Sequence, residues 1–598
     1  MKSRTLCLLL ALCLLLGLLS GCGDDETPPQ PLYADRADAK RGELTGVSKA
    51  DSAEAVRDCL TQAGQMNTEG REVATHADDR TPGKELRLAA PETALVQTDG
   101  AYIYMLDSYG LVIVSAAGKD SRILSYSRVA VDANVTQRRL FVRGDRAAVL
   151  CAMQDFSYDA DGELLQGGKT ELILLDISDR SAPKELTRTV VDGTLTAADF
   201  TGDALCLVTR HSFWNLPEPE QTEALLPWFS EAGQKTALRP SDLYLCEEPA
   251  QAAVTVVTTL RPEDGRVLDA LAFLGGADAV LLAQNAIYLG RTRWHEQKTE
   301  PNRDEKPYVV VGYTQTAQTE LIRLVCDPDG GLSLDGGCTQ DGALLDEAAL
   351  SLQGTTLCAA LQVNECMFNA FTDEAHGWTN YELVSEERHS RIVLMDATLR
   401  AENGVMLDNI GGAHGVLACR FLENLAFLTT EKPEDPVYCA DLSTPDAPAM
   451  GGSLVLPGTS ARFYALKDGM VLVLSETTET NGLTLSVFNG AAADRMERTD
   501  RETVRQSSQA LRNPNALFTD AQTGLIGLPL EGEHAAYLLL ECDGGNLKEK
   551  GTLALEYVPD DARTLLIDGL LYICGPGEVY VADPEEAELL AVVSNAVG

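Results

Sequence analysis

The chain has 598 residues, of which 45% are hydrophobic and 6% aromatic, and its 90 acidic residues outnumber 48 Lys and Arg for a formal charge of -42. This composition predicts a globular protein, and the length suits either one large all-β domain or two to four domains of about 150 residues. Nucleic acid is excluded as an expected partner, because binding to phosphates depends on Lys and Arg that displace counterions.

Residues 1–21 are predicted to be a lipoprotein signal peptide. Lys2 and Arg4 precede an apolar run over residues 6–19 that is too short for a spanning helix of about 20 residues. The run is followed by Ser20-Gly21-Cys22, and Leu19 to Cys22 resemble a bacterial lipobox, which makes Cys22 the expected lipidation site. An ordinary signal peptide with a chance Cys is the alternative. The lipid alone is expected to attach the protein to the outer side of the bacterial cell membrane.

Residues 22–94 are expected to form a lipidated, flexible stalk, because their polar start is rich in Pro and cannot bury a core. One short helix is predicted over residues 48–65. Ser48 and Asp51 have the spacing of a capping box at its start. This helix is expected either to act as a spacer or to dock on the body.

From residue 95 onward, pairs of short apolar strands joined by Gly and Asp turns recur along the chain. Asp-Gly and Gly-Asp steps supply the positive φ angles of two-residue hairpin loops. A third strand follows each pair, and several end on an Asp suited to an Asx-turn before a fourth strand, as at Asp176 and Asp441. The turns that carry the pattern lie at residues 98–100, 143–145, 201–203, 353–355, 467–469 and 567–569.

This repeat predicts an all-β fold with a single β-propeller over residues 95–598. Radial repetition of four-stranded antiparallel sheets forms such a ring. Separate first and last units give nine blades, whereas a closing blade shared between them gives eight. About eight blades are predicted, within a range of seven to nine. The units restart near residues 95, 137, 196, 276, 346, 415, 461, 510 and 562.

Four segments spread along the body carry a family resemblance. They are residues 96–104, 176–184, 523–529 and 571–583. These segments resemble the bacterial secreted and lipoprotein β-propeller family, which is distantly related to WD40 repeats, and the resemblance covers roughly residues 48–594. It implies the fold and export, and it brings no reaction with it. The residues just before the first blade, 88–92, depart from the acidic, Val-rich lead-in of that family.

Twelve cysteines remain beyond Cys22, an even number that permits disulfides in an exported protein. Cys151, Cys206, Cys358 and Cys574 fall at the same place in the second strand of different units, and such positions around a ring are too far apart for disulfides. Most cysteines are therefore expected to be buried thiols. Tandem CxxC pairs and an HExxH motif are absent from the sequence, which predicts no metal and no other cofactor.

Four consecutive units are expected to carry long loops between their second and third strands, over residues 153–170, 211–252, 293–319 and 364–390. These loops contain all four tryptophans. One interpretation is an aromatic rim that binds a protein, peptide or glycan. The other is that the tryptophans pack the insertions into a cap. The candidate binding residues are Trp214, Trp228, Trp294, His295, His376 and Trp378.

The predicted function is a binding module that acts through the face with these insertions. The alternative is a hydrolase with an active site at the central channel, but no catalytic residue is assigned. Paired carboxylates from different blades are distant in sequence, so their spacing does not reveal them. A G-x-S-x-G elbow is missing, which disfavours an α/β-hydrolase mechanism. Converging ionisable side chains in a narrow channel would favour an enzyme, and an exposed Trp surface would favour binding.

Overall fold

The computed structural model describes most of the chain between Leu32 and Ser594. The signal segment, Cys22 and Trp214 lie outside the described residues. Within the described residues, no helix has the length and apolar character needed to cross a membrane. The described residues are 32–44, 46–74, 85–88, 95–107, 110–129, 134–158, 164–213, 216, 219–247, 251–283, 285–304, 307–401, 403–411, 415–430, 432, 434–458, 460–477, 482–490, 496–559 and 561–594.

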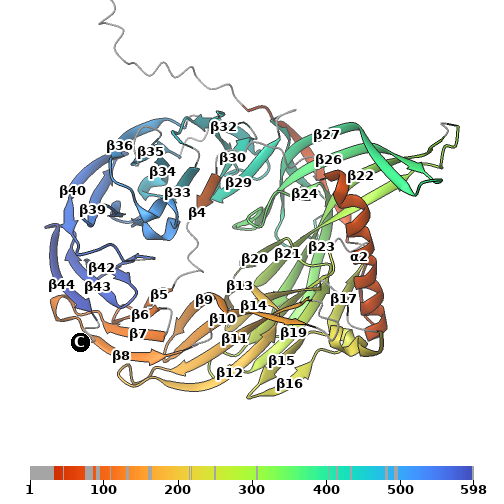
Figure 1. The fold of residues 1–598 in the computed structure, drawn as a ribbon. Coiled ribbons are helices and arrows are strands. Elements are labelled where there is room, and N and C mark those ends of the chain that lie inside the picture. Colours follow the sequence, from red (N-terminus) through yellow and green to blue (C-terminus); the bar gives the residue numbers. More distant parts are fainter. Residues whose placement is uncertain are drawn as a thin grey trace, which may run out of the picture.

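Four-stranded antiparallel units follow one another around a ring, each with its first strand nearest the centre (Figure 1). We number these units as blades in chain order. Blade 1 consists of β5 (Val96–Thr98), β6 (Tyr102–Leu106), β7 (Gly110–Ser115) and β8 (Ile123–Arg128). Blade 2 consists of β9 (Val135–Arg143), β10 (Arg146–Tyr158), β11 (Leu164–Asp176) and β12 (Lys184–Asp192). Blade 3 consists of β13 (Thr194–Thr201), β14 (Ala204–Ser212), β18 (Ala253–Leu260) and β19 (Val267–Leu274).

Blades 4 and 5 share one sheet, because β22 of blade 4 pairs with β26 of blade 5. Blade 4 consists of β20 (Ala279–Ala283), β21 (Ala286–Lys298), β22 (Val309–Cys326) and β23 (Leu332–Asp341). Blade 5 consists of β25 (Leu350–Gln353) with the short β24 (Ala343–Leu344), β26 (Thr356–Asp373), β27 (Trp378–Asp396) and β28 (Asn403–Ile410). Blade 6 consists of β29 (Val416–Leu422), β30 (Leu425–Thr430), β31 (Val437–Asp441) and β32 (Ala449–Leu454).

The C-terminal third of the chain completes the ring. Short 3₁₀ turns η3 (Gly118–Asp120), η6 (Lys467–Gly469), η8 (Gln509–Leu511) and η9 (Pro514–Ala516) lie in connections. Blade 7 consists of β33 (Ser460–Ala465), β34 (Met470–Glu476), β35 (Leu483–Asn489) and β36 (Arg498–Val504). Blade 8 consists of β37 (Phe518–Thr519), β38 (Leu525–Leu530), β39 (Ala536–Asp543) and β40 (Asn546–Ala554). Blade 9 consists of β41 (Arg563–Ile567), β42 (Leu570–Gly575), β43 (Glu578–Asp583) and β44 (Glu588–Ser594).

The turns between first and second strands have the conformation that their residues predict. In blade 9, Asp568 and Gly569 have φ angles of 49° and 79°, and in blade 7, Asp468 and Gly469 have φ angles of 60° and 71°. Two successive residues with positive φ suit the twist of a tight hairpin, and Asp and Gly tolerate that conformation best. The middle strands that follow are almost wholly buried, as in β34 and β35.

Apolar side chains pack between each blade and the next, so the core is a set of layers around the ring. The ring closes in the same way, because Ile103 and Val112 of blade 1 pack with Tyr572 and Val579 of blade 9. Within the described residues the propeller has nine four-stranded blades. Nine lies at the upper end of the predicted range of seven to nine. The preferred value of eight needed a closing blade shared by both ends, but the first and last blades each supply their own four strands.

The segment before blade 1 runs along the outer rim of the ring. Its strands β1 (Asp35–Lys40) and β2 (Gly42–Glu43) extend the outer strands of blades 5 and 4. The next strand, β3 (Val47–Lys49), pairs with β17 (Leu243–Cys246), which in turn pairs with the outer strand of blade 3. We call residues 35–63 the strap. Much of the region that the sequence assigned to a stalk is therefore part of the folded body.

The predicted helix exists but occupies different residues. Helix α2 spans Ala53–Ala74, whereas residues 48–65 were expected. Ser48 does not cap it, because Ser48 pairs with Leu245 in the rim sheet. The hydroxyl of Ser52 instead accepts a hydrogen bond of 3.2 Å from the Ala55 amide. The helix docks on blade 3, where Val56 and Leu60 are fully buried.

One further strand, β4 (Glu85–Leu88), lies at the centre of the ring (Figure 1). It pairs in parallel with β33, the innermost strand of blade 7. Leu86 is buried among residues of blades 6 and 7. The chain thus adds a strand to the inner side of blade 7, towards the centre of the ring, where the alternative enzyme is expected to have its active site.

All twelve described cysteines are free thiols, and all but Cys366 are buried. Cys151, Cys206, Cys358 and Cys574 lie in the second strands of blades 2, 3, 5 and 9 and have no exposed surface. Burial raises the pKa of Cys151 to about 11 and that of Cys358 to about 12. The prediction of buried thiols at these equivalent positions is confirmed.

Candidate functional site

Three of the four long insertions are not loops but continuations of the blade strands. The second and third strands of blades 4 and 5 reach 13 to 19 residues, well beyond the usual five or six. In blade 2, β10 and β11 are 13 residues each. The expectation of loops was wrong here because these segments alternate β-branched and aromatic residues with polar ones, a pattern typical of strands.

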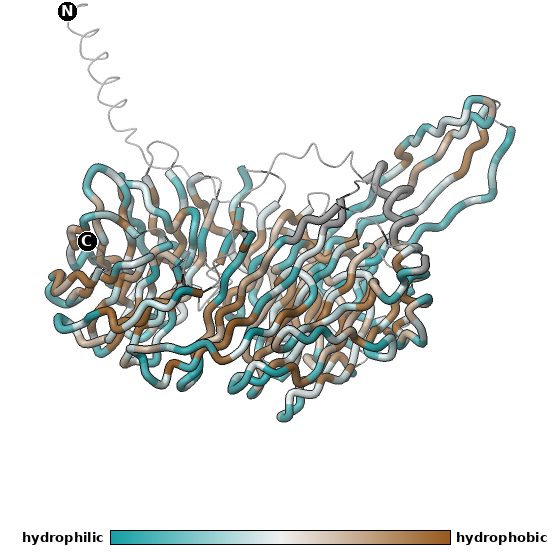
Figure 2. The backbone as a smooth tube through the Cα atoms, turned by 60° about the horizontal axis from the view of Figure 1, so that its bottom comes forward, coloured by the Kyte–Doolittle hydropathy of each residue, from teal (hydrophilic) through white to brown (hydrophobic). Residues whose placement is uncertain are grey.

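The hairpins of blades 4 and 5 join into one projecting sheet. Val309 to Thr316 of β22 pair antiparallel with Glu365 to Thr372 of β26. The strand order is β21-β22-β26-β27, and the sheet leaves the ring on one face (Figure 2). We call it the arm. It consists of residues 293–298, 309–318, 364–373 and 378–389.

Aromatic rings cross one face of the arm. Tyr313 and Phe368 stack at 4.9 Å between ring centroids, and Phe368 meets Tyr381 edge-on at 5.9 Å. The ammonium of Lys298 lies 5.0 Å from the Tyr313 ring. Phe368 is only 1% exposed although it lies outside the ring. This row therefore stiffens the arm across its four strands.

A second aromatic group lies at the tip, near the turn between β26 and β27. The ring of Tyr308 is 5.5 Å from that of Trp378 and 6.3 Å from that of Phe371. Trp378 remains 44% exposed. In the adjoining turn, Asp373 accepts two backbone hydrogen bonds and lies 2.8 Å from the His376 ring, a contact that lowers the pKa of Asp373. The tip is thus an ordered surface with an accessible indole ring.

The outermost strand of the arm, β27, faces solvent along its distal half. Every residue from Trp378 to Glu387 is exposed, and the neighbouring strand β28 accompanies β27 only over Ser390 to Leu394. The exposed side chains include Leu383 and Val384, each 56% exposed. The segment 373–387 contains five acidic residues and no Lys or Arg. This edge therefore combines strand backbone, apolar side chains and negative charge.

The base of the arm is held by buried charges. Glu320 is fully buried and pairs with the guanidinium groups of Arg291 and Arg293, the latter at 3.4 Å. Arg293 also donates a hydrogen bond of 3.0 Å to Gln318, and the ring of His295 lies 3.0 Å from the same amide oxygen. The network joins β21 to β22 where the arm leaves the ring, so it orients the arm.

The structure gathers only some of the residues that the sequence singled out. Trp294, His295, His376 and Trp378 belong to the arm or its turn, but Trp294 lies near the base and Trp378 at the tip. Trp228 does not belong to this group. It lies in β15 (Trp228–Glu231), which with β16 (Gln234–Ala237) extends the outer edge of blade 2, and Lys235 covers its ring at 4.0 Å. The expected common rim of tryptophans is therefore wrong.

The insertion of blade 3 forms the packed cap that was the alternative interpretation. It contains η4 (Pro219–Leu225), η5 (Pro240–Asp242) and β17. Leu225, Leu226 and Leu238 are buried against helix α2. The interpretation as a cap thus fits blade 3, and the interpretation as an exposed surface fits the arm.

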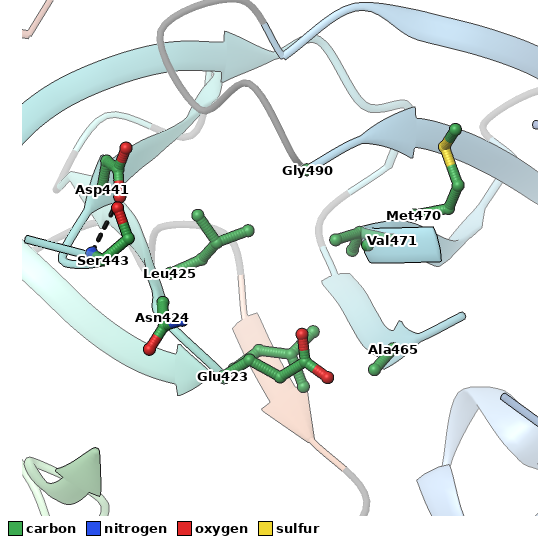
Figure 3. Close-up of a pocket in the computed structure, with 11 residues that line it drawn as sticks. Glu423, Asn424, Leu425, Asp441, Ser443, Ala465, Met470, Val471 and Gly490 are labelled. Carbon is green, nitrogen blue, oxygen red and sulfur yellow. Dashed lines mark hydrogen bonds between the residues drawn. The ribbon is translucent and has the colours of Figure 1, made fainter. Parts of the chain in front are cut away.

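A small cavity of about 210 Å³ lies between blades 6 and 7 (Figure 3). It is next to the turns that join the first and second strands of these blades. Its lining includes Glu423 and Asn424 from one hairpin turn and Asp441 and Ser443 from another. The carboxylate of Asp441 accepts a 2.9 Å hydrogen bond from the Ser443 amide, as expected for an Asx-turn. These side chains therefore serve the turns that surround the cavity.

Comparison with known proteins agrees with the ring of four-stranded blades. A model of the family described as "Beta propeller domain" matches residues 90–586. The chain belongs to this β-propeller domain family. An uncharacterized protein of Archaeoglobus fulgidus is 24% identical over 443 residues, which cover 68% of this chain and 69% of that protein. An uncharacterized protein of Methanocaldococcus jannaschii is 23% identical over 208 residues, which cover 34% of this chain and 31% of that protein.

Solved structures similar to this β-propeller include the WD40 domain of SCAP from fission yeast, with 7% identity and a TM-score of 0.28 over 74% of this chain and 96% of that one. Another is a putative 6-phosphogluconolactonase from Bacteroides fragilis, with 10% identity and a TM-score of 0.27 over 56% of this chain and 88% of that one. The family match over residues 90–586, and not these distant structures, confirms the resemblance to a β-propeller family.

Sequence reasoning missed the outer edge of the arm. Tyr381, Leu383 and Val384 are not among the predicted binding residues, which are all Trp or His. The alternation of Trp378, Asn380 and Glu382 with Thr379, Tyr381 and Leu383 was the available signal for a strand. The pairing of β22 with β26, which joins the two hairpins into one arm, has no local signal.

Proposed function

We propose that this β-propeller is a binding module whose arm accepts an extended segment of a partner protein as an additional strand beside β27. The observation that carries the proposal is the exposed distal half of β27, where strand backbone faces solvent beside Trp378, Leu383 and Val384. A strand edge of this kind binds peptide backbone by hydrogen bonds, and apolar side chains on both faces add specificity.

The charge of the edge favours a segment with Lys or Arg at alternate positions. Glu365 and Glu387 face each other across β26 and β27, an arrangement in which like charges repel. A cationic side chain on a strand added beside β27 would lie next to Glu387 and relieve that repulsion. Glu382 lies further along the same strand and extends the acidic edge. Of a protein, a peptide and a glycan, a protein segment best supplies both backbone hydrogen bonds and regularly spaced cations.

We also propose that the protein works outside the cytoplasmic membrane, attached by a lipid on Cys22. Support comes from the charged and apolar residues 1–19 and from the small residues before Cys22. The first residues of the body, such as Leu32, pack against the core between blades 5 and 6. The arm arises from blades 4 and 5, so Leu32 lies at a blade that also carries the arm.

The binding proposal is tested with labelled synthetic peptides of about eight residues that alternate Lys with Val, or Glu with Val, measured by fluorescence anisotropy on the full chain. We expect the Lys peptide to bind at least about ten times more tightly than the Glu peptide, with an affinity that falls as salt rises. Leu383→Lys is expected to abolish binding, because it adds a charged side chain to the docking edge.

A matched control is Leu186→Lys, which changes a Leu that is 45% exposed on the outer strand of blade 2. This variant is expected to bind like the wild type. Equal affinity for the two peptides, or equal binding by Leu383→Lys and the wild type, would refute the proposed docking edge. Circular dichroism on each variant establishes that the propeller is folded.

A further inference from the structure

Two cysteines outside the blades meet where the strap docks on the ring. Cys59 lies in helix α2 and Cys246 in β17, and both belong to the apolar cluster that holds the helix against blade 3. The Sγ atom of Cys59 lies 3.5 Å from the carbonyl oxygen of Cys246. The two thiols also influence each other, because Cys246 lowers the pKa of Cys59 and Cys59 raises the pKa of Cys246. They are 7% and 5% exposed, so each cysteine keeps a small solvent-accessible area.

The argument against disulfides between blades does not apply to this pair. Cys151, Cys206 and Cys574 are kept apart because they occupy equivalent positions around the ring. Helix α2 and β17 are instead packed directly on each other, and the 3.5 Å contact of the Cys59 Sγ atom with the carbonyl oxygen of Cys246 brings the two residues close together. Proximity of the two backbones is the geometric condition for a disulfide.

The surroundings of the pair stabilise a thiolate. The Cys246 thiol donates a 3.1 Å hydrogen bond to the carbonyl of Leu274, which also accepts a hydrogen bond from the buried guanidinium of Arg291. The thiol of Cys246 is the main cause that lowers the pKa of Cys59 to about 7, and the charge of Arg291 acts in the same direction. Hydrogen bonding to Cys59 and burial raise the pKa of Cys246. Cys59 is therefore the attacking sulfur of the pair.

We propose that Cys59 and Cys246 form a disulfide that locks helix α2 and the strap onto blade 3. The Cys59 thiolate attacks one sulfur of a small-molecule disulfide, forms a mixed disulfide and releases one thiolate, which takes up a proton. Cys246 then loses its proton, attacks the Sγ atom of Cys59 and expels the second thiolate. The small disulfide is reduced to two thiols, and two protein thiols are oxidised to one disulfide.

The bond would join residues that are 187 positions apart in the sequence. A cross-link over so long a segment restricts the unfolded chain strongly and raises the stability of the folded state. It would hold the segment before blade 1 in place independently of the strand pairs of the rim. The arm plays no part in it, so this proposal and the binding proposal stand or fall separately.

The test uses the full chain, incubated with an excess of glutathione disulfide over glutathione, alkylated and digested without reduction. Mass spectrometry is expected to find a peptide pair joined through Cys59 and Cys246 that separates on reduction. Oxidation is expected to raise the midpoint of thermal unfolding. Full alkylation of both cysteines in the wild type, or cross-links only to other cysteines, would overturn the proposal.

Variants separate this bond from other thiol chemistry. Cys59→Ser and Cys246→Ser are each expected to lose the linked pair and the rise in the unfolding midpoint. Cys542→Ser is the matched control, because Cys542 is also 5% exposed but lies in β39, and it is expected to behave as the wild type. The wild type alone decides the proposal, because its two cysteines are found either linked or fully alkylated. The test therefore still gives an answer if one of the variants fails to fold.

Discussion

Glu320 shows how a single buried charge supports the arm. Its carboxylate is fully buried between Arg291 and Arg293, which are 6% and 9% exposed in their side chains. Burying three charged groups costs solvation free energy, and the cost is offset only while all three are present. Burial already lowers the pKa of Arg291, which reflects the loss of water around its guanidinium. The network is therefore most sensitive to removal of its one negative charge.

The variant Glu320→Gln keeps the shape of the side chain but leaves two guanidinium charges without their counter-charge. We expect it to lower the free energy of unfolding by about 3–5 kcal/mol, measured by urea denaturation. The control Asp203→Asn removes an exposed partner of Arg143, where Asp203 is 79% exposed, and is expected to change stability by less than about 1 kcal/mol. Similar losses in both variants would contradict this account of the base of the arm.

At the scale of the element, helix α2 shows where local signals and pairing compete. Both Ser48 and Ser52 are good N-cap residues in an isolated chain. The structure uses Ser52, because β17 recruits residues 47–49 into a strand before the helix begins. The type of element was therefore readable from the sequence, whereas its start depended on a neighbour almost two hundred residues away.

Substitution of Ser48 and of Ser52 shows which of the two residues caps the start of helix α2. Ser52→Ala is expected to destabilise the helix by about 1 kcal/mol, because the Ala55 amide loses its acceptor. Amide hydrogen exchange in α2 should quicken accordingly. Ser48→Ala is expected to change stability by less than about 0.5 kcal/mol, since Ser48 is exposed in β3 and pairs through its backbone. Faster exchange in Ser48→Ala than in Ser52→Ala would show that Ser48 is the cap.

At the scale of the whole molecule, side-chain packing closes the ring. Blades 1 and 9 each have four strands of their own, so among the described residues neither of these two blades takes a strand from the other end of the chain. The hydroxyl of Tyr572 in blade 9 accepts a 2.9 Å hydrogen bond from the amide of Gly118, which lies in η3 between the third and fourth strands of blade 1. The strap adds a second set of long-range contacts, across the rims of blades 3 to 5. The N-terminal and C-terminal regions thus stabilise one ring from different sides.

The anchoring of this ring has a measurable consequence. Leu32 lies ten positions after Cys22, and an extended chain of ten residues spans at most about 35 Å. A lipid on Cys22 would therefore keep the edge of the ring near blade 5 close to the membrane. We expect the wild type to sediment with membranes and to carry acyl groups by mass spectrometry, and Cys22→Ser to be released. Recovery of unmodified wild type in the soluble fraction would contradict the anchor.

Local chemistry made much of the fold predictable. Turns such as Asp568-Gly569 require positive φ, and apolar runs such as β34 require burial, so both features can be read from neighbouring residues. Their repetition predicts blades, and the placement of Cys151 and Cys574 in equivalent strands predicts buried thiols. The number of blades was less secure, because closure is a relation between the two ends of the chain.

What the sequence by itself determined, then, is the repeated four-stranded unit and the class of fold, because turns and alternation act over a few residues. Tertiary structure alone decided the arm, since β22 and β26 pair across two blades, and the register of that pairing depends on how the blades are placed. It also decided the contact of Cys59 with Cys246. Residues far apart in the chain meet only when the whole ring has packed, and no short stretch of sequence specifies that meeting.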